Sequence, residues 1–411
     1  MAGVYDQPTN AAIAGTLICF VVIPSLLLNS FLISMFAKRK RLQVPVMYFL
    51  ISLATSDIIG VVIWCLPTVI AALGFDYLYT DVGLCQTQVI TWTFHQTLNS
   101  HTFVILTLER CLKFWNPNLH SKVFYNDIVV IMMIVGHWIF ELVCALFPLM
   151  GWGTPTYYPR QLQCNFNNPK MPSHLNAMFF YTFCVPFLFM IIVWPMIATK
   201  YRQLTAKVAP WDDSALAAQA ESYGGNLAAD SKKSPVRKGR GTKAVDEDDW
   251  SEDELYSQIV ALRPYEDYDG REYHKHVYKY RMREYYLAVT IFVAWLIFLL
   301  CWLIFISMTY MQVYQATNDI SSGVYVSATW WAMFTLACKP VFYFIVNPRF
   351  RWNLRKALNC QPFPQKKPKP APATHTTPRI REDPVYAKST GPQNQNIYRH
   401  VAPGLDYKDG I

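Results

Sequence analysis

Charged residues are scarce over most of this 411-residue chain: Asp, Glu, Lys and Arg make up 16% of it, whereas 53% of its residues are hydrophobic. The hydrophobic residues are not spaced to leave a helix with one polar face. They gather in blocks of about 20 or more, the length that crosses roughly 30 Å of hydrocarbon. Helices with almost no polar stripe exclude an ordinary soluble fold.

Seven hydrophobic blocks predict seven membrane-spanning helices, because a backbone in lipid must satisfy its own hydrogen bonds. The fold class is therefore an all-α membrane protein, a seven-transmembrane-helix bundle. The first block is too long for a signal peptide, and no basic stretch precedes it. The blocks lie at about residues 12–37, 44–73, 83–113, 127–150, 174–203, 283–311 and 322–346.

Lys and Arg are absent from two connections between the blocks, residues 74–82 and 312–321. Other connections are basic: residues 38–41 read Lys-Arg-Lys-Arg, and the C-terminal tail holds many more. Because basic connections stay in the cytoplasm, we expect an extracellular N-terminus in a multi-pass protein of the plasma membrane. The net charge of +9 is then explained by the basic cytoplasmic connections, and it does not indicate a nucleic-acid partner.

Most of the ten cysteines lie inside hydrophobic blocks, where they act as small hydrophobic side chains. Cys85 and Cys164 fall at ends predicted to be extracellular, where disulfides persist. A bridge between them would tie the second extracellular loop to the third helix. Cys360 follows the last membrane-proximal segment and is either a palmitoylation site or a free thiol.

Composition divides the chain into six parts. Residues 204–275 pass from an Ala/Gly/Ser-rich stretch to a basic and then an acidic run, which predicts disorder. Residues 350–358 mix hydrophobic and basic side chains, as in an amphipathic helix on a membrane surface. The parts are an extracellular N-terminus (1–11), transmembrane helices 1–5 (12–203), a disordered third intracellular loop (204–275), transmembrane helices 6–7 (276–346), an amphipathic eighth helix (347–358) and a disordered cytoplasmic tail (359–411).

A few polar residues interrupt the hydrophobic blocks. Lipid penalises such side chains, so each is a candidate functional residue. The short N-terminus leaves ligand sensing to the bundle and its outer loops. The candidates are Asn29 in the first block, Asp57 in the second, Glu109 and Arg110 at the end of the third, Glu284 at the start of the sixth and Lys339 in the seventh.

The order and spacing of these residues resemble those of the rhodopsin-like G-protein-coupled receptors, over all seven helices. Glu109-Arg110-Cys111 is similar to the family's acidic–Arg–aromatic motif, and Asn29 and Asp57 match its sodium-site residues. Further matches are Cys85 in the third helix, Pro117 in the loop after it, Trp138 in the fourth, Pro186 in the fifth, Phe298, Cys301 and Trp302 in the sixth, and Pro340, Tyr343, Asn347, Phe350 and Arg351 at the end of the seventh.

The resemblance implies a receptor that binds a ligand in its helical bundle and activates a heterotrimeric G protein, with an arrestin as a further partner and membrane lipids around it. Arg110 can make two parallel bonds to a carboxylate, and a pair with Glu284 would hold the resting state until a ligand shifts the equilibrium. Trp302 above Phe298 would be the trigger, and Lys339, Pro340 and Tyr343 would complete the activation switch. A plain interfacial charge pair and a core-packing Trp302 are the alternatives.

Four positions depart from the family pattern. Cys111 replaces an aromatic residue, and Trp194 replaces the fifth helix's tyrosine. Ile304 replaces the proline that bends the sixth helix, so we expect a straighter, stiffer helix. Lys339 replaces the asparagine before Pro340, and its ammonium could take the place of a sodium ion beside Asp57, which predicts insensitivity to sodium.

The predicted ligand cavity is aromatic and mostly neutral. Residues 147–152 followed by Cys164 look like the matching region of opsins, but Met333 stands where opsins carry the retinal-binding lysine. Trp92 stands where amine receptors carry an aspartate. We therefore expect a neutral small molecule, a lipid or a short peptide, and no cofactor. The cavity residues are Trp92, His95, Gln96, Trp302 and Met333, with Trp330 and Trp331 either there or in an interfacial belt.

Three further interpretations are weighed against a signalling receptor. His137 and Glu141 lie one turn apart and could form a metal or proton pair, although packing is favoured without a third partner. A seven-helix ion pump or channel would need a retinal lysine and more carboxylates inside the helices. A receptor-like protein that does not signal conventionally would explain the departures at Trp194, Ile304 and Lys339. No pattern of hydrolytic or group-transfer enzymes is present.

Overall fold

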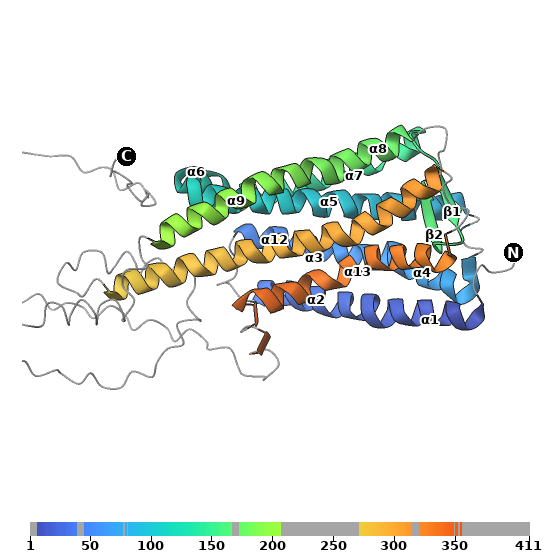
Figure 1. The fold of residues 1–411 in the computed structure, drawn as a ribbon, viewed down its shortest axis with the longest axis horizontal. Helices are drawn as coiled ribbons and strands as arrows, with labels where there is room; N and C mark the ends of the chain where they lie inside the picture. The colour runs from blue at the N-terminus through green and yellow to red at the C-terminus, as the bar shows by residue number, and fades with distance from the viewer. Residues whose placement is uncertain are drawn as a thin grey trace, which may run out of the picture. The chain divides into compact units, whose positions relative to one another are not determined.

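The computed structural model describes residues 6–38, 45–76, 79, 81–166, 172–206, 271–314, 320–348, 350–351 and 354–355. Residues 1–351 form one compact unit, in which long helices run side by side (Figure 1). The membrane-spanning segments are, in chain order, α1 (Gln7–Leu17) with η1 (Ile18–Val22) and α2 (Ile23–Lys38); α3 (Pro45–Gly60) with η3 (Val61–Cys65), α4 (Leu66–Ile70) and η4 (Ala71–Phe75); α5 (Val82–Trp115); α7 (Asp127–Ala145); α8 (Ser173–Phe179) with η7 (Phe180–Cys184) and α9 (Val185–Ala206); α12 (Arg271–Val313); and α13 (Ser322–Val346). The predicted seven-helix bundle is thereby confirmed.

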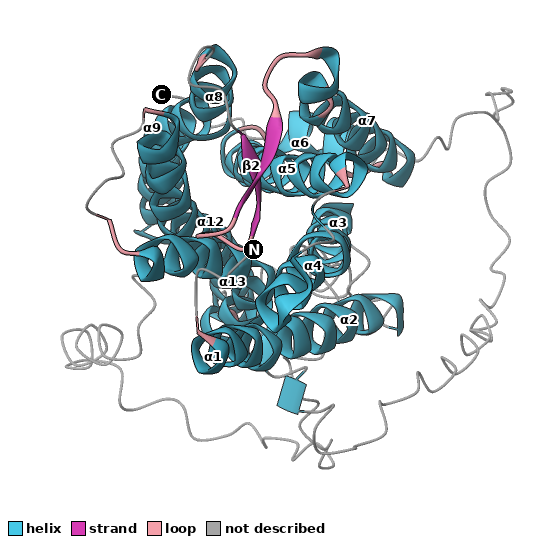
Figure 2. Ribbon diagram, turned by 90° about the vertical axis from the view of Figure 1, so that its right-hand side faces the viewer, coloured by secondary structure: helices cyan, strands magenta, loops and turns pink. Residues whose placement is uncertain are grey.

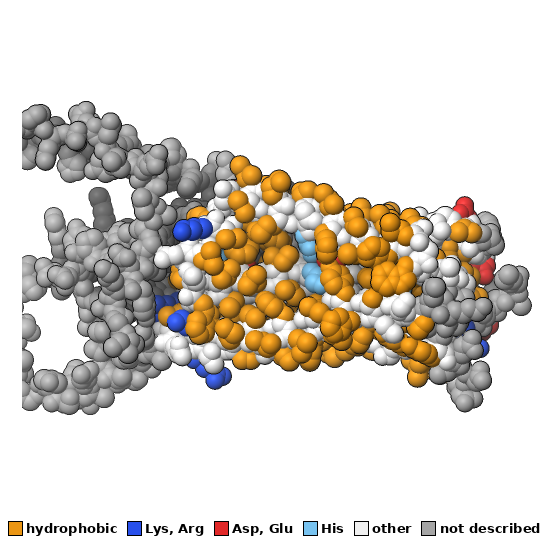
Figure 3. All heavy atoms as spheres, turned by 90° about the horizontal axis from the view of Figure 1, so that it is seen from above, with side chains coloured by type: hydrophobic (Ala, Val, Ile, Leu, Met, Phe, Trp, Pro, Cys, Tyr) orange, Lys and Arg blue, Asp and Glu red, His pale blue; other side chains and the backbone are white. Residues whose placement is uncertain are grey.

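Among the described residues, six segments are long and apolar enough to cross a membrane by length and composition. The remaining segment, α5, is the third in chain order. It can be more polar because other helices surround it: residues 91–100 are all buried. The opposite holds for α7, whose Ile139, Phe140 and Val143 are more than half exposed. Hydrophobic side chains cover the flank of the bundle (Figure 3), as a lipid-facing surface requires.

A β-hairpin closes one end of the bundle. Strands β1 (Pro155–Tyr158) and β2 (Gln163–Phe166) pair antiparallel, and every residue of β2 is buried. Figure 2 looks onto this end, called the hairpin end below, and shows β2 across the ring of helices. A disulfide joins Cys164 of β2 to Cys85 of α5, with a Cα–Cα distance of 5.4 Å. Two shorter helical elements are α6 (Pro117–Phe124), after α5, and η6 (Phe147–Met150), after α7.

Prolines explain three of the four π-helical turns of the described helices. The π-helical turns η1, η3 and η7 each end two residues before a proline. The proline ring clashes with the carbonyl four residues back, and proline has no N–H to donate to that carbonyl. Thr182 O, four residues before Pro186, accepts instead from Ser100 Oγ of α5 at 2.6 Å. Lipid offers no donor, so a neighbouring helix must supply one.

Pro340 inside α13 likewise leaves a backbone carbonyl without its usual helical donor. Leu336 O, four residues before it, accepts from Ser25 Oγ at 2.9 Å and from Asn29 Nδ2 at 3.0 Å. The predicted sodium-site residue Asn29 therefore bonds to this carbonyl of α13, with its amide nitrogen also 3.0 Å from Ser25 O. Position 304 lies within α12, which continues without a break for 43 residues.

Several helix ends differ from the predicted boundaries. α1 begins at Gln7, inside the predicted N-terminal segment, and α9 and α12 extend to Ala206 and from Arg271, into the predicted loop. Hydrophobic length underestimates such helices because their backbone bonds continue past the lipid into water. Phe350, Arg351, Leu354 and Arg355 of the predicted eighth helix are helical. Cys360, the tail 359–411 and residues 207–270 of the predicted loop lie outside the described residues.

Replacing Ser100 by alanine should destabilise the protein by about 1–2 kcal/mol, because Thr182 O would lose a buried donor. The measurement is thermal unfolding of the full-length protein in lipid nanodiscs. In a Pro186→Ala background the helix regains its own N–H donor at position 186, so the Ser100→Ala cost should shrink. Thr97→Val is the matched control, since its hydroxyl bonds within α5; an equal cost in both backgrounds would refute this role of Ser100.

Candidate functional site

Arg110 lies near the end of α5 opposite the hairpin and is 1% exposed. Its Nη2 donates to Glu109 Oε1 at 2.7 Å, and its Nε also donates to Glu109 Oε2. Its Nη1 donates to Glu284 Oε2 of α12. One guanidinium therefore links two carboxylates from two helices, and the planar fork of Arg suits this geometry.

Two further side chains complete this group, called the Arg110 cluster. Lys113 Nζ lies 2.8 Å from Glu284 Oε2, and His120 Nε2 lies 2.5 Å from Glu109 Oε1. His120 comes from α6, which Asn116 caps by accepting from Leu119 N at 3.0 Å. The sequence did not reveal these partners: Lys113 was visible one turn after Arg110, but no spacing predicts that His120 turns back to Glu109.

In the Arg110 cluster, the carboxylates of Glu109 and Glu284 contact two permanent cations, Arg110 and Lys113. Removing one partner of a buried ion pair leaves an uncompensated charge, which costs far more than the pair contributes. Loss of any one charge from the Arg110 cluster would therefore be costly.

A second cluster lies about 15 residues nearer the hairpin along α5, and is called the Asp57 cluster. Lys339 Nζ of α13 lies 2.6 Å from Asp57 Oδ1 of α3 and also donates to Asn99 Oδ1. His95 Nε2 lies 2.9 Å from the same Asp57 oxygen. Lys339 and Asp57 are each 1% exposed. The Lys339 ammonium thus contacts the Asp57 carboxylate directly, as a cation that belongs to the chain itself.

His95 was expected in the ligand cavity, and the structure places it between that region and Asp57. Its ring lies 6.3 Å from that of Trp302. Gln96 and Met333 are buried, with Gln96 Oε1 unbonded among the described residues. Trp330 and Trp331 pack on Phe334, and Trp331 is 42% exposed, as the belt interpretation expects.

Aromatic rings surround Trp302, which is completely buried. The ring centroids of Trp64 and Phe305 lie 5.5 Å away, and those of Phe298 and Trp92 lie 6.0 and 6.2 Å away. The sequence did not predict that Trp64 belongs to this group, because the position of a Trp within a hydrophobic block does not show which way its side chain faces. The indole of Trp302 thus sits in a close-packed cage of rings, called the Trp302 cage below.

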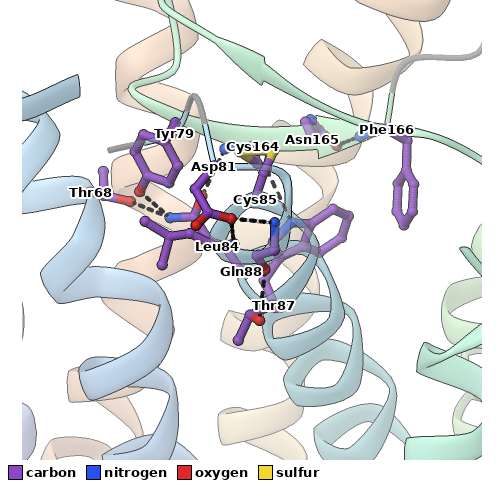
Figure 4. Close-up of a disulfide and its surroundings, with 12 residues drawn as sticks. Thr68, Tyr79, Asp81, Leu84, Cys85, Thr87, Gln88, Cys164, Asn165 and Phe166 are labelled. Carbon is purple, nitrogen blue, oxygen red and sulfur yellow. Dashed lines mark hydrogen bonds between the residues drawn. A yellow bond between two sulfur atoms is a disulfide. The ribbon is translucent and has the colours of Figure 1, made fainter. Parts of the chain in front are cut away.

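Strand β2 rests on this cage. Trp64 Nε1 donates to Gln163 Oε1 at 2.8 Å, and Trp92 Nε1 donates to Cys164 O at 3.3 Å. Figure 4 shows the disulfide above α5, where Gln88 accepts from Cys164 N at 2.7 Å and donates to Tyr79. The hairpin, the disulfide and the Trp302 cage form one continuous packing unit.

Two of the four departures, Trp194 and Cys111, occupy the contact among α5, α9 and α12. Trp194 stacks on Phe292 with centroids 4.4 Å apart, and Cys111 packs in a small hydrophobic cluster with Ile197 and Ala288. Ile304, by contrast, is 44% exposed on α12. Trp194 therefore joins α9 to α12 by ring stacking, where a tyrosine would offer a hydroxyl.

The sequence and the fold were compared with known proteins. A family model described as the seven-transmembrane receptor (rhodopsin family) matches residues 28–343. Over 211 residues the chain is 23% identical to rhodopsin of Neoniphon sammara and 24% identical to rhodopsin of Poecilia reticulata, covering 49% of this chain. These alignments span 58% and 57% of those relatives, so the chain spans less than two thirds of their length.

One solved structure, of squid rhodopsin, has the same fold. The TM-score is 0.58 at 16% sequence identity, with 87% of this chain and 90% of that chain covered. A sequence identity this low supports a shared fold and nothing more. The departures at Lys339 and Trp194 therefore have to be interpreted from this chain's own contacts.

Replacing Lys339 by methionine should destabilise the protein by about 3–5 kcal/mol, because Asp57 would be left buried without its cation. The double variant Lys339→Met/Asp57→Asn should recover most of this loss. Lys339→Asn should in addition make the unfolding midpoint rise with NaCl but not with choline chloride, whereas the unmodified chain should not distinguish the two salts. A sodium-specific rise in the unmodified chain would contradict the built-in cation.

Proposed function

Because the chain belongs to the rhodopsin family of seven-transmembrane receptors, we propose that it is a G-protein-coupled receptor that binds a ligand in its helical bundle and activates a heterotrimeric G protein. The observation that carries this proposal is the Arg110 cluster, in which Glu284 of α12 is bonded to Arg110 of α5. In this state α12 is held against α5. This contact supports the proposal of a resting state in which Glu284 is paired with Arg110.

Activation requires a second arrangement of the same parts. Separating Glu284 from Arg110 would free the end of α12 and open a crevice beside α5, where a G protein or an arrestin would bind. Tyr201 stacks on Tyr285 at 3.8 Å and Trp194 on Phe292 at 4.4 Å. We expect α9 and α12 to move as a pair, because each stacked pair is worth about 0.5–1.5 kcal/mol beyond its buried area.

The Trp302 cage is the proposed trigger. Its rings are linked through His95 to Asp57 and Lys339, so a shift of Trp302 would reach the Asp57 cluster through one side chain. A neutral small molecule, a lipid or a short peptide suits the aromatic surroundings. Met333 offers no amine for a Schiff base, so covalent binding of retinal is not proposed.

The charges at the two ends of the bundle support an extracellular N-terminus at the plasma membrane. On the face in Figure 3, Lys and Arg side chains gather at the Arg110 end of the hydrophobic surface, whereas the acidic side chains lie at the hairpin end with a smaller basic patch beside them. Lys113, Lys122 and Lys200 belong to segments at the Arg110 end. Basic residues stay on the cytoplasmic side, which would put the hairpin outside.

Charge reversal at Glu284 tests the proposal. Glu284→Lys should raise ligand-independent nucleotide exchange several-fold in membranes that contain a panel of G proteins, because Arg110 would face a cation. Asp127→Asn is the matched control: it removes an exposed carboxylate at the start of α7 and should leave the basal rate unchanged.

The alternatives give other outcomes in the same cells. Silence of Glu284→Lys across the panel, with surface expression retained, would favour a receptor-like protein that does not signal conventionally. Currents under voltage clamp that persist without G proteins would favour an ion pump or channel.

A further inference from the structure

A carboxylate lies in the lipid-facing helix α7, apart from the Arg110 cluster, the Asp57 cluster and the Trp302 cage. Glu141 is 1% exposed, whereas Ile139, Phe140 and Val143 beside it are exposed by 52–59%. Its charged partners among the described residues are histidines, His101 of α5 and His137 of α7, with neither Lys nor Arg among them. An ionised carboxylate without a cation is not stable in such a place.

Side chains from three helical segments converge on Glu141. His101 Nδ1 lies 2.9 Å from Glu141 Oε1, and His137 Nδ1 lies 3.6 Å from it. Tyr181 of η7 donates to the same oxygen at 2.9 Å. Glu141 Oε2 has no hydrogen-bond partner among the described residues. The third partner that the sequence did not place for His137 and Glu141 is therefore His101, one of two imidazoles on a single carboxylate.

Both ring nitrogens of His101 face oxygen acceptors. Nδ1 lies 3.0 Å from Thr97 O as well as near Glu141, and Nε2 lies 3.3 Å from Tyr181 O. A neutral imidazole donates from one nitrogen only, and the imidazolium donates from both. Both ring nitrogens can donate to these oxygens at the same time only when His101 carries a second proton.

His137 does not need a second proton in this geometry. Its Nε2 lies 3.3 Å from Leu98 O and can donate to it, which leaves Nδ1 free of a hydrogen toward Glu141. Cys144 of α7, one turn from Glu141, is the other titratable group that faces the cluster among the described residues. A proton placed on His101 makes the group neutral overall, as an imidazolium beside a carboxylate.

We propose that Glu141, His101, His137 and Tyr181 form a proton-binding site at the lipid-facing contact of α5, α7 and η7. The bound species is a single proton, held by His101 with Glu141 as its counter-ion. The two histidine side chains are 16% and 10% exposed, and Figure 3 shows histidine among the hydrophobic side chains of this flank. The site thus borders the lipid instead of the bundle interior.

The site is placed to act on the fifth helical segment. Tyr181 and Thr182 belong to the π-helical turn η7, and α5 bonds to the carbonyls of both through His101 and Ser100. Loss of the proton would remove a donor to Tyr181 O and leave Glu141 without its cation. Protonation would therefore bias how η7 and α9 pack on α5.

A double-mutant cycle at two pH values tests the site on the full-length chain in nanodiscs, independently of any signalling. The variants are His101→Asn, Glu141→Gln and both together, and the measurement is the unfolding equilibrium. The stabilisation exists while the site holds its proton and is lost when that proton leaves. We therefore expect a coupling of at least tenfold at pH 6 that falls several-fold by pH 9.

His174→Asn combined with Glu141→Gln is the control cycle, because His174 packs on Trp152 and Phe166; it should show no coupling at either pH. Should His101→Asn not fold, infrared difference spectra between pH 6 and pH 9 supply the readout. The unmodified chain should lose imidazolium bands together with a change in a carboxylate band that is missing in Glu141→Gln. Equal coupling at both pH values, or histidine bands that do not depend on Glu141, would overturn the proposal.

Discussion

The burial of α5 is the constraint on which the rest of the structure depends. Its buried polar groups reach neither water nor a lipid that can bond to them, so their partners come from α5 itself or from neighbouring helices. His95 and Asn99 bond to the Asp57–Lys339 pair, Ser100 and His101 bond to η7, and Arg110 bonds to Glu284. One helix therefore sets the position of α3, α13, η7 and α12.

The clusters on α5 differ in how readily they can open. His95 and Arg110 are separated by about 22 Å along the helix axis, at about 1.5 Å per residue. The Asp57 cluster is enclosed by α3, α5 and α13, and its cation cannot leave because it is part of the chain. The Arg110 cluster lies at the end of the helix, where a partner protein could take over a bond. Movement is therefore expected at α12 before α13.

Hydrophobic length and loop charge were sufficient to predict seven helices, and the motif positions were sufficient to expect Arg110 near Glu284 and Lys339 near Asp57. The partners His120, Trp64 and His101 could not be predicted, because a contact between helices depends on how each is rotated about its axis. His95 shows the size of this effect, since a small rotation decides between a cavity and Asp57. Likewise Asn29 was assigned by its motif to a sodium site, but a proline in another helix determines its partner.

The hairpin has a kinetic consequence. β2 is buried and tied to α5 by a disulfide, so a molecule that reached Trp302 from the hairpin end would have to wait for the strand to lift. The observed association rate would then level off at the opening rate of the hairpin as concentration rises, instead of increasing without limit. Dissociation would be slowed by the same barrier, giving long residence times even for modest affinity.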